Sequence, residues 1–187
     1  MSAWRSLLRP EVPLFFVAIL RLTIGLELVS QGYDKLVQGY VRLDEQTPGR
    51  TNPLRYTLEM WIEEHRITYV GWGNRRTQRQ VAMFPWYRAF LQTAVLPNTA
   101  IFAGLVTVAE IGLGLLLVLG LLVRVASVLS ILLLLNYLFA TWHLGFPYTT
   151  LNILFLVALV VLLVTGAGRA LGVDAWLHEK FPDIPVF

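Results

Sequence analysis

Apolar residues dominate four long stretches of this chain, at about residues 13–32, 98–119, 121–144 and 148–165. Each stretch is close to the ~20 residues that an α-helix needs to cross ~30 Å of hydrocarbon. Glycines follow the last three stretches, where a left-handed helix cap is easiest for glycine. The pattern predicts an all-α integral membrane protein, a four-helix bundle that forms a single domain over residues 1–187. The three glycines are Gly120, Gly145 and Gly166.

The connection between the first two stretches, residues 40–96, is long and polar but is not a plain loop. The Asn-Pro pair at 52–53 is typical of an N-cap followed by proline in the first helical turn. Apolar residues such as Leu58 and Trp61 then recur at helical spacing. This predicts an amphipathic helix that ends at about Glu64.

A second amphipathic segment starts at Pro85 and carries aromatic residues towards the second apolar stretch. Because Trp and Tyr favour the bilayer interface, both helices are predicted to lie flat on the membrane surface or under a partner. The alternative is a small cap packed on the bundle. The surface predicted to meet lipid or a partner consists of Trp61, Arg75, Arg76, Arg79, Trp86 and Tyr87.

The composition supports a membrane location. Only 14% of the residues are charged, whereas a soluble domain has about 25%. Between Pro97 and Gly168 the charged residues are Glu110 and Arg124 alone. The net charge of +3 comes from basic residues interleaved with acidic ones, so anionic lipid headgroups or an acidic protein fit better than nucleic acid. The chain has no cysteine and therefore no disulfide or thiolate metal site.

Arg5 and Arg9 precede the first apolar stretch, as in a signal peptide. No small-residue cleavage site follows, so we expect this stretch to be retained as the first span. An even number of spans puts both termini on one side of the membrane. The third and fourth spans are joined by the uncharged turn "GFPY". This favours both termini in the cytoplasm. As the location we expect a prokaryotic-type inner membrane.

Two charges lie inside the first span, where each costs roughly 2.5–3.5 kcal/mol on insertion scales. Arg21 and Glu27 are six residues apart and point about 120° away from each other, so each is expected to face another helix. Arg21 is about 12 Å below the membrane surface, and Glu110 on the second span is about 15 Å below the same surface. We therefore predict a buried Arg21–Glu110 ion pair. Structural polar contacts between helices are the ordinary role for such groups.

Other polar residues are predicted to form a layer in one half of the membrane. This layer is either structural or a pocket for a quinone headgroup or another polar ligand, with Glu27 as a proton-accessible carboxyl. No catalytic residue and no metal site is expected, because no His, Asp or Glu cluster has ligand spacing. His143 stands at the end of the third span and is expected in an interfacial role. The candidate pocket residues are Glu27, Gln31, Asn136, Asn152 and His143.

Small residues recur on one face of the second span, at Ala100, Gly104 and Gly112. Such a face lets another helix approach closely. The spacing alone leaves open whether that helix belongs to this chain or to a partner subunit.

Three segments carry a resemblance to a known family: "LRLTIGLELVSQGYDKL", "AEIGLGLLLVLGLLVR" and "GAGRALGVDAWL". With them the chain resembles the DoxX-like group of four-helix membrane proteins, which is similar to the DoxD small subunit of thiosulfate:quinone oxidoreductase. The long 40–96 connection departs from the group's pattern. The residues that carry the resemblance are Arg21, Gly25, Gly32, Lys35, Glu110, Gly112, Gly114, Gly120, Arg124, Gly166, Gly168 and Asp174.

The missing cofactor ligands, the helices of the long connection and the resemblance lead to two function hypotheses. The first is a non-catalytic accessory subunit of a larger redox or energy-converting membrane complex, which lines a quinone path and binds lipid, quinone and other subunits. The second is a quinone-linked oxidoreductase subunit of the thiosulfate:quinone type. A small-solute carrier ranks last, because the sequence shows neither inverted repeats nor broken helices.

Overall fold

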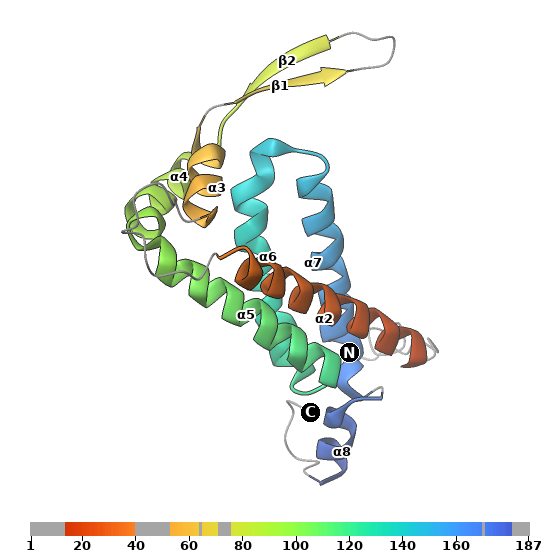
Figure 1. Cartoon of the computed structure of the whole chain (residues 1–187). Helices are drawn as coiled ribbons and strands as arrows, with labels where there is room; N and C mark the ends of the chain where they lie inside the picture. Colours follow the sequence, from red (N-terminus) through yellow and green to blue (C-terminus); the bar gives the residue numbers. More distant parts are fainter. Residues whose placement is uncertain (1–13, 40–52, 64, 71–75, 170, 181–187) are drawn as a thin grey trace. The chain divides into compact units, whose positions relative to one another are not determined.

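The computed structural model describes residues 14–39, 53–63, 65–70, 76–169 and 171–180. Four helices in this part are long and apolar enough to cross a membrane, which confirms the predicted all-α membrane fold (Figure 1). They contain α2 (Leu14–Val37), α5 (Thr99–Leu119), α6 (Val123–Thr141) and α7 (Tyr148–Thr165). The chain is a multi-pass membrane protein.

The predicted ends of the spans agree with the structure where a glycine takes a left-handed conformation. Gly120 and Gly166 have φ angles of 66° and 63°, and both follow the last residue of a helix. At the first span the prediction was five residues short, because α2 continues through Gly32 to Val37. Gly32 does not end the helix but allows close packing, since a Cβ there would lie 2.6 Å from Cγ1 of Ile111 on α5.

Contacts divide the chain into two compact units, which are described separately. Unit 1 comprises Met1–Tyr33, Val108–Leu132 and Phe155–Phe187, and unit 2 comprises Asp34–Thr107 and Leu133–Leu154. The assignment of the whole chain to one domain stays a prediction.

In unit 1, α2 and α5 cross at two glycines. A Cβ on Gly25 would lie 2.9 Å from the Gly114 carbonyl oxygen, and a Cβ on Gly114 would lie 2.7 Å from the Gly25 carbonyl oxygen. Both distances are below ordinary van der Waals contact, so only glycine allows the two backbones to approach this closely. Without a hydrophobic drive between helices in lipid, such close packing is a main source of helix association.

The close approach of α2 uses Gly114, which is not one of the small residues of the predicted face, and whether that face meets a partner helix stays a prediction. A Cβ added to Gly112 would meet nothing within 4 Å among the described residues, and Gly112 is exposed. The glycine at the crossing is Gly114, two residues further along. Since residues two apart point to different sides of a helix, Gly112 faces outward instead.

Unit 2 contains the connection between the first two spans. It holds α3 (Pro53–Ile62), the strands β1 (His65–Val70) and β2 (Arg76–Val81), and α4 (Pro85–Phe90). The two helices confirm the predicted helical segments, although residue 52 of the predicted N-cap lies outside the described residues. The strands pair antiparallel, with His65 opposite Val81 and Val70 opposite Arg76 (Figure 1). This hairpin is an addition that the sequence analysis did not contain.

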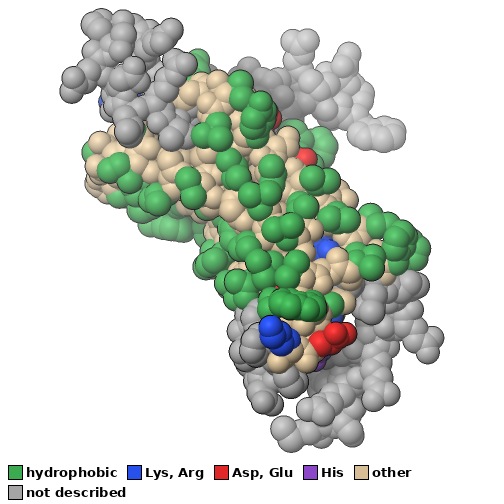
Figure 2. Space-filling view, turned by 60° about the horizontal axis from the view of Figure 1, so that its bottom comes forward, with side chains coloured by type: hydrophobic (Ala, Val, Ile, Leu, Met, Phe, Trp, Pro, Cys, Tyr) green, Lys and Arg blue, Asp and Glu red, His purple; other side chains and the backbone are tan. Residues whose placement is uncertain are grey.

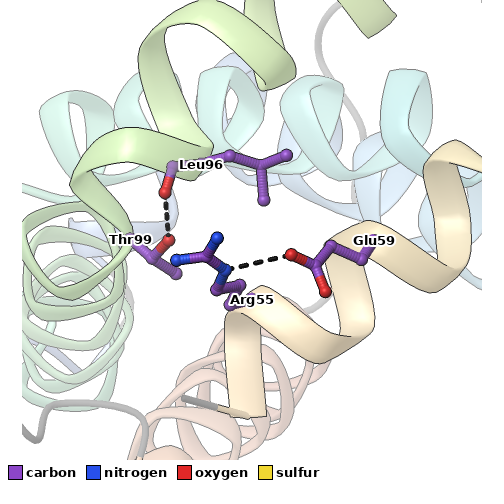
Figure 3. A network of polar contacts seen from close by, with 4 residues as sticks. All are labelled: Arg55, Glu59, Leu96 and Thr99. Carbon is purple, nitrogen blue, oxygen red and sulfur yellow. Dashed lines mark hydrogen bonds and ion pairs between the residues drawn. The ribbon is translucent and has the colours of Figure 1, made fainter. Parts of the chain in front are cut away.

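The helix from α4 to α5 changes its hydrogen-bond register before it enters the second span. The π-helical turn η1 (Leu91–Val95) and the 3₁₀ turn η2 (Leu96–Asn98) separate α4 from α5. Pro97 lies in η2 and has no N–H to donate, which explains the local change of register. At the first residue of α5, the Thr99 hydroxyl donates to the Leu96 carbonyl over 2.8 Å (Figure 3).

The helices of the connection pack into a hydrophobic core with the end of α6. This favours the alternative of a cap packed on the bundle over helices lying free on the membrane surface. The solvent side of α3 carries an Arg55–Glu59 ion pair of 3.0 Å (Figure 3). The buried members of this core are Leu58, Ile62, Met83, Tyr87, Leu91, Val95 and Ala140.

Large apolar side chains face outward along the membrane helices. Val108 on α5 is 71% exposed and Leu154 on α7 is 62% exposed. In the view of Figure 2, hydrophobic side chains cover much more of the described surface than charged ones do. An apolar exterior of this kind is the surface that lipid tails contact.

Two glycines of α5 provide a matched test of this packing, because Gly114 faces α2 and Gly112 faces outward. We expect Gly114→Ala to lower the free energy of unfolding by about 1–3 kcal/mol, because a methyl group would collide with the α2 backbone. Gly112→Ala should be neutral or stabilising by up to about 1 kcal/mol, because alanine favours the helix. Unfolding by sodium dodecyl sulfate in mixed micelles, followed by circular dichroism, measures both. Equal effects of the two variants would contradict the glycine crossing.

Candidate functional site

Arg21 on α2 is bound by the segment that follows α7. Its side chain is 1% exposed, although it projects from a membrane helix. Nη1 donates to the Ala167 carbonyl oxygen over 2.8 Å, and Nη2 donates to the Leu171 carbonyl oxygen over 3.2 Å. Ala167 belongs to η4 (Ala167–Arg169), and Leu171 precedes α8 (Val173–Lys180). The guanidinium therefore joins the first and last parts of unit 1.

Glycines make the space for this guanidinium. A Cβ on Gly120 would collide with Arg21 Nη1 and would lie 2.6 Å from the Gly172 Cα. A Cβ on Gly172 would lie 2.6 Å from the same Nη1. Gly120 and Gly172 thus allow two chain segments to close around a buried cation.

Asp174, the second residue of α8, caps the start of α6. Its Oδ1 accepts a hydrogen bond from the Leu122 N–H over 2.7 Å, and its Oδ2 accepts one from the Val123 N–H over 2.9 Å. The Asp174 N–H in turn donates to the Gly120 carbonyl over 2.9 Å. The N–H groups at a helix start have no partner within the helix, so this carboxylate supplies what a local N-cap residue normally would.

The carboxylate of Asp174 also interacts electrostatically with the Arg21 guanidinium. A Cβ on Gly168 would collide with this carboxylate, so that glycine too is required by the packing. We call Arg21, Gly120, Gly168, Gly172 and Asp174 the arginine clamp. Its position at one end of unit 1, and its use of backbone groups, make it a structural site.

The predicted Arg21–Glu110 ion pair stays a prediction. Both residues are 1% exposed, so the sequence correctly indicated two buried charged residues in neighbouring helices. What sequence reasoning missed is that backbone carbonyls bind the guanidinium. A signal for these contacts is the glycine-rich segment before Asp174, where the backbone is accessible to a neighbouring side chain.

Among the described residues, Glu27 does not pack against another helix, which corrects the expectation that both charges face one. Its side chain is exposed, and its Oε1 accepts a hydrogen bond from Nε2 of Gln31 over 2.9 Å. Gln31 lies four residues along α2 and is exposed as well. The two residues therefore form a polar pair on the outer side of a membrane-spanning helix.

The other three candidate pocket residues lie in unit 2. Asn136 on α6 accepts hydrogen bonds from the Tyr87 hydroxyl at its backbone oxygen, over 3.1 Å, and at its Oδ1, over 2.8 Å. Asn152 Nδ2 donates to the Thr141 hydroxyl oxygen over 3.2 Å. His143 is buried at 8% exposure in η3 (Trp142–Leu144). The proposed pocket itself stays a prediction.

Aromatic rings surround the Tyr87–Asn136 contact. The Trp86 ring lies 5.2 Å from the Phe139 ring, and the Tyr87 ring lies 6.1 Å from the same ring. Trp86 is 57% exposed, as expected for a lipid or partner surface, whereas Tyr87 is 3% exposed and belongs to the core. Tyr87 was therefore wrongly assigned to the surface.

The remaining surface candidates have different positions. Trp61 is half-buried on α3 and packs against the core of unit 2. Arg76 and Arg79 lie on β2, and Arg75 lies outside the described residues. Within the described part of the chain, no group of three His, Asp or Glu residues could hold a metal ion.

Residues 56–186 match the model of a family described as the thiosulfate:quinone oxidoreductase (TQO) small subunit DoxD. The match covers well over half of the chain. The chain belongs to the DoxD family. Neither a curated protein nor a solved structure matches it. The matched range includes three of the membrane helices of this DoxD chain and Asp174, while Arg21 lies before it.

Loss of the helix cap should destabilise the arginine clamp. We expect Asp174→Ala to lower the free energy of unfolding by about 1–3 kcal/mol, because the Leu122 and Val123 N–H groups would lose their acceptor in a buried place. Asp174→Asn should cost less, since its amide oxygen can still accept one of the two bonds. Detergent unfolding measures both, with Glu179→Ala on the exposed side of α8 as the control. An effect no larger than that of the control would contradict the capping role.

Proposed function

We propose that this chain is a non-catalytic membrane subunit of a quinone-linked oxidoreductase complex. The observation that carries the proposal is the DoxD family match over residues 56–186, since the family is described as the small subunit of such an enzyme. The chain would anchor the complex in the bilayer and line the path of the quinone, while a partner subunit would hold the redox centre. We place it in a prokaryotic-type inner membrane with both termini in the cytoplasm.

The donor groups of the chain support this division of labour. Iron–sulfur clusters are held mainly by cysteine thiolates, and the sequence contains no cysteine. The arginine clamp is built around backbone carbonyls and a helix cap. Its groups stabilise the fold and offer no nucleophile or redox-active side chain.

A second candidate, a quinone-reducing subunit in its own right, is favoured by the Tyr87–Asn136 contact. A quinone carbonyl accepts hydrogen bonds, and the contact with Tyr87 uses only the oxygens of Asn136. The Asn136 side-chain NH₂ group is therefore a donor available beside aromatic rings that could stack on a quinone. Under this hypothesis the chain itself would catalyse electron transfer, in which two thiosulfate ions each lose one electron and become joined by an S–S bond, while one quinone takes up the two electrons and two protons.

The two candidates are separated by extraction from native membranes in mild detergent. We expect a particle with additional subunits that reduces decylubiquinone with thiosulfate, and no such activity in the purified chain alone. Activity of the chain alone would favour the second candidate. Recovery of the chain as a single small species without activity would contradict both. A reporter fused to the carboxyl terminus tests the expected cytoplasmic side.

The quinone path has its own matched test within an active particle. Asn136→Leu removes the side-chain NH₂ group, and we expect it to raise the KM for decylubiquinone several-fold while leaving the thiosulfate dependence unchanged. Asn98→Leu, which changes an exposed asparagine that bonds only its own helix, should leave both constants unchanged. Assembly of the particle must be equal for the two variants. Equal KM values for decylubiquinone in the Asn136→Leu and Asn98→Leu variants would rule out a quinone contact at Asn136.

A further inference from the structure

One side of α2 carries polar residues where a membrane helix should face lipid. Thr23, Glu27, Ser30 and Gln31 lie within an arc of about 100° on the helix, and all four are exposed. We call these four residues the polar stripe. One turn further along the same helix, Asp34 is exposed as well.

The depth of the polar stripe rules out ordinary water contact. Glu27 stands twelve residues after Phe15 and ten before Val37, the two ends of the span. At 1.5 Å per residue it is about 18 Å from one end and about 15 Å from the other. This is the middle of the bilayer, where a carboxylate facing hydrocarbon is strongly unfavourable.

The rest of α2 shows that this placement is specific. Its buried face includes Arg21, Ile24 and Leu28. Next to the polar stripe, an exposed apolar sector contains Leu22 and Leu26, with Leu26 at 59% exposure. The exposed side of α2 is thus divided into an apolar sector suited to lipid and a polar sector that is not.

Within the part of the chain that the structure describes, only part of the hydrogen-bonding capacity of the polar stripe is satisfied. Gln31 donates to one oxygen of Glu27, and the Thr23 hydroxyl donates to the Ile19 carbonyl of its own helix. The second carboxylate oxygen of Glu27 and the side-chain oxygen of Gln31 can both accept further bonds. An occupant of this face would therefore offer hydrogen-bond donors.

The charge of the polar stripe indicates which kind of molecule can cover it. It contains a carboxylate and no basic residue, and the nearby Lys35 lies over the Tyr137 ring at 5.5 Å. A second copy related by a two-fold axis would bring two Glu27 carboxylates towards each other, which is unfavourable in a low dielectric. A quinone offers only hydrogen-bond acceptors, whereas the side-chain oxygens that the stripe leaves over on Glu27 and Gln31 call for donors.

We propose that the polar stripe is the contact face for a membrane helix of a partner subunit that carries an arginine or lysine at mid-bilayer depth. The basic side chain would pair with Glu27, and the close-packed helices would exclude lipid from Ser30 and Thr23. This inference rests on the proposed function in that it requires a partner subunit, and it names the chemistry of that partner.

Coverage of the stripe can be measured one position at a time, because the chain contains no cysteine. Spin labels are attached to Thr23→Cys and Ser30→Cys in the stripe, and to Leu22→Cys and Leu26→Cys in the apolar sector as controls. Collision with dissolved oxygen reports contact with lipid. In the assembled complex we expect the stripe labels to be about fivefold or more less accessible than the controls, because a packed helix excludes lipid. In the isolated chain in nanodiscs, all four labels should be accessible.

Three outcomes of this experiment would overturn the inference. Accessible stripe labels in an intact complex would mean that no helix covers the stripe. Shielded labels in an isolated chain with the mass of a dimer would assign the face to a second copy. If the stripe labels of the isolated chain are shielded only after decylubiquinone is added, the polar stripe is a contact face for the quinone.

A defined probe tests the chemistry even if no complex is recovered, in which case the proposed function fails but the inference is still decided. Leucine-rich membrane peptides with one central arginine, glutamate or leucine are added to the isolated labelled chain in nanodiscs. We expect the arginine peptide to bind about tenfold more tightly than the leucine peptide, as for polar contacts between membrane helices. Glu27→Gln should remove this preference, and Leu26→Ala should retain it. Equal binding of the arginine and leucine peptides to the unsubstituted chain would overturn the inference.

Discussion

A guanidinium buried among membrane helices has to find hydrogen-bond acceptors within the protein, and unit 1 is organised around that requirement. Arg21 reaches the backbone carbonyls of Ala167 and Leu171, which lie almost 150 residues away along the sequence. Meeting these acceptors fixes the segment after α7 against α2. The same segment places Asp174 at the start of α6. One buried cation thus determines where the last part of the chain lies, and through it how α6 begins.

Glycine makes this arrangement possible at two different places. At the crossing of α2 and α5, Gly25 and Gly114 bring two backbones into contact, and at the arginine clamp Gly120 and Gly172 leave room for the guanidinium. The glycines of the helix crossing allow close packing, and the glycines of the arginine clamp leave space for a polar group. In a membrane interior, where the hydrophobic effect does not drive helices together, both contributions matter more than apolar bulk.

The sequence predicted the features that the bilayer itself imposes. The four spans and the glycines after them follow from hydrocarbon thickness and from the cap conformation, so α7 was predicted with its observed bounds. The partners of Arg21 were missed because backbone carbonyls leave no trace in residue identity. The outward position of Glu27 was missed because the identity and depth of a charged residue do not determine whether its partner lies within the same chain. The β-hairpin was missed because its arginines suggested a solvated connection, although segments such as "ITYV" favour strands.

The cap of α6 by Asp174 also has a consequence for how the protein is made. Ribosomes synthesise and insert membrane helices in order, so α5 and α6 enter the bilayer well before residue 174 is available. Until then, the N–H groups of Leu122 and Val123 at the α5–α6 turn must be held by water or lipid headgroups. The hairpin of these two helices is therefore left with an open end during biogenesis. Asp174 on α8 then supplies the missing acceptors, so the cap of α6 is completed only after the helices that it joins have been inserted.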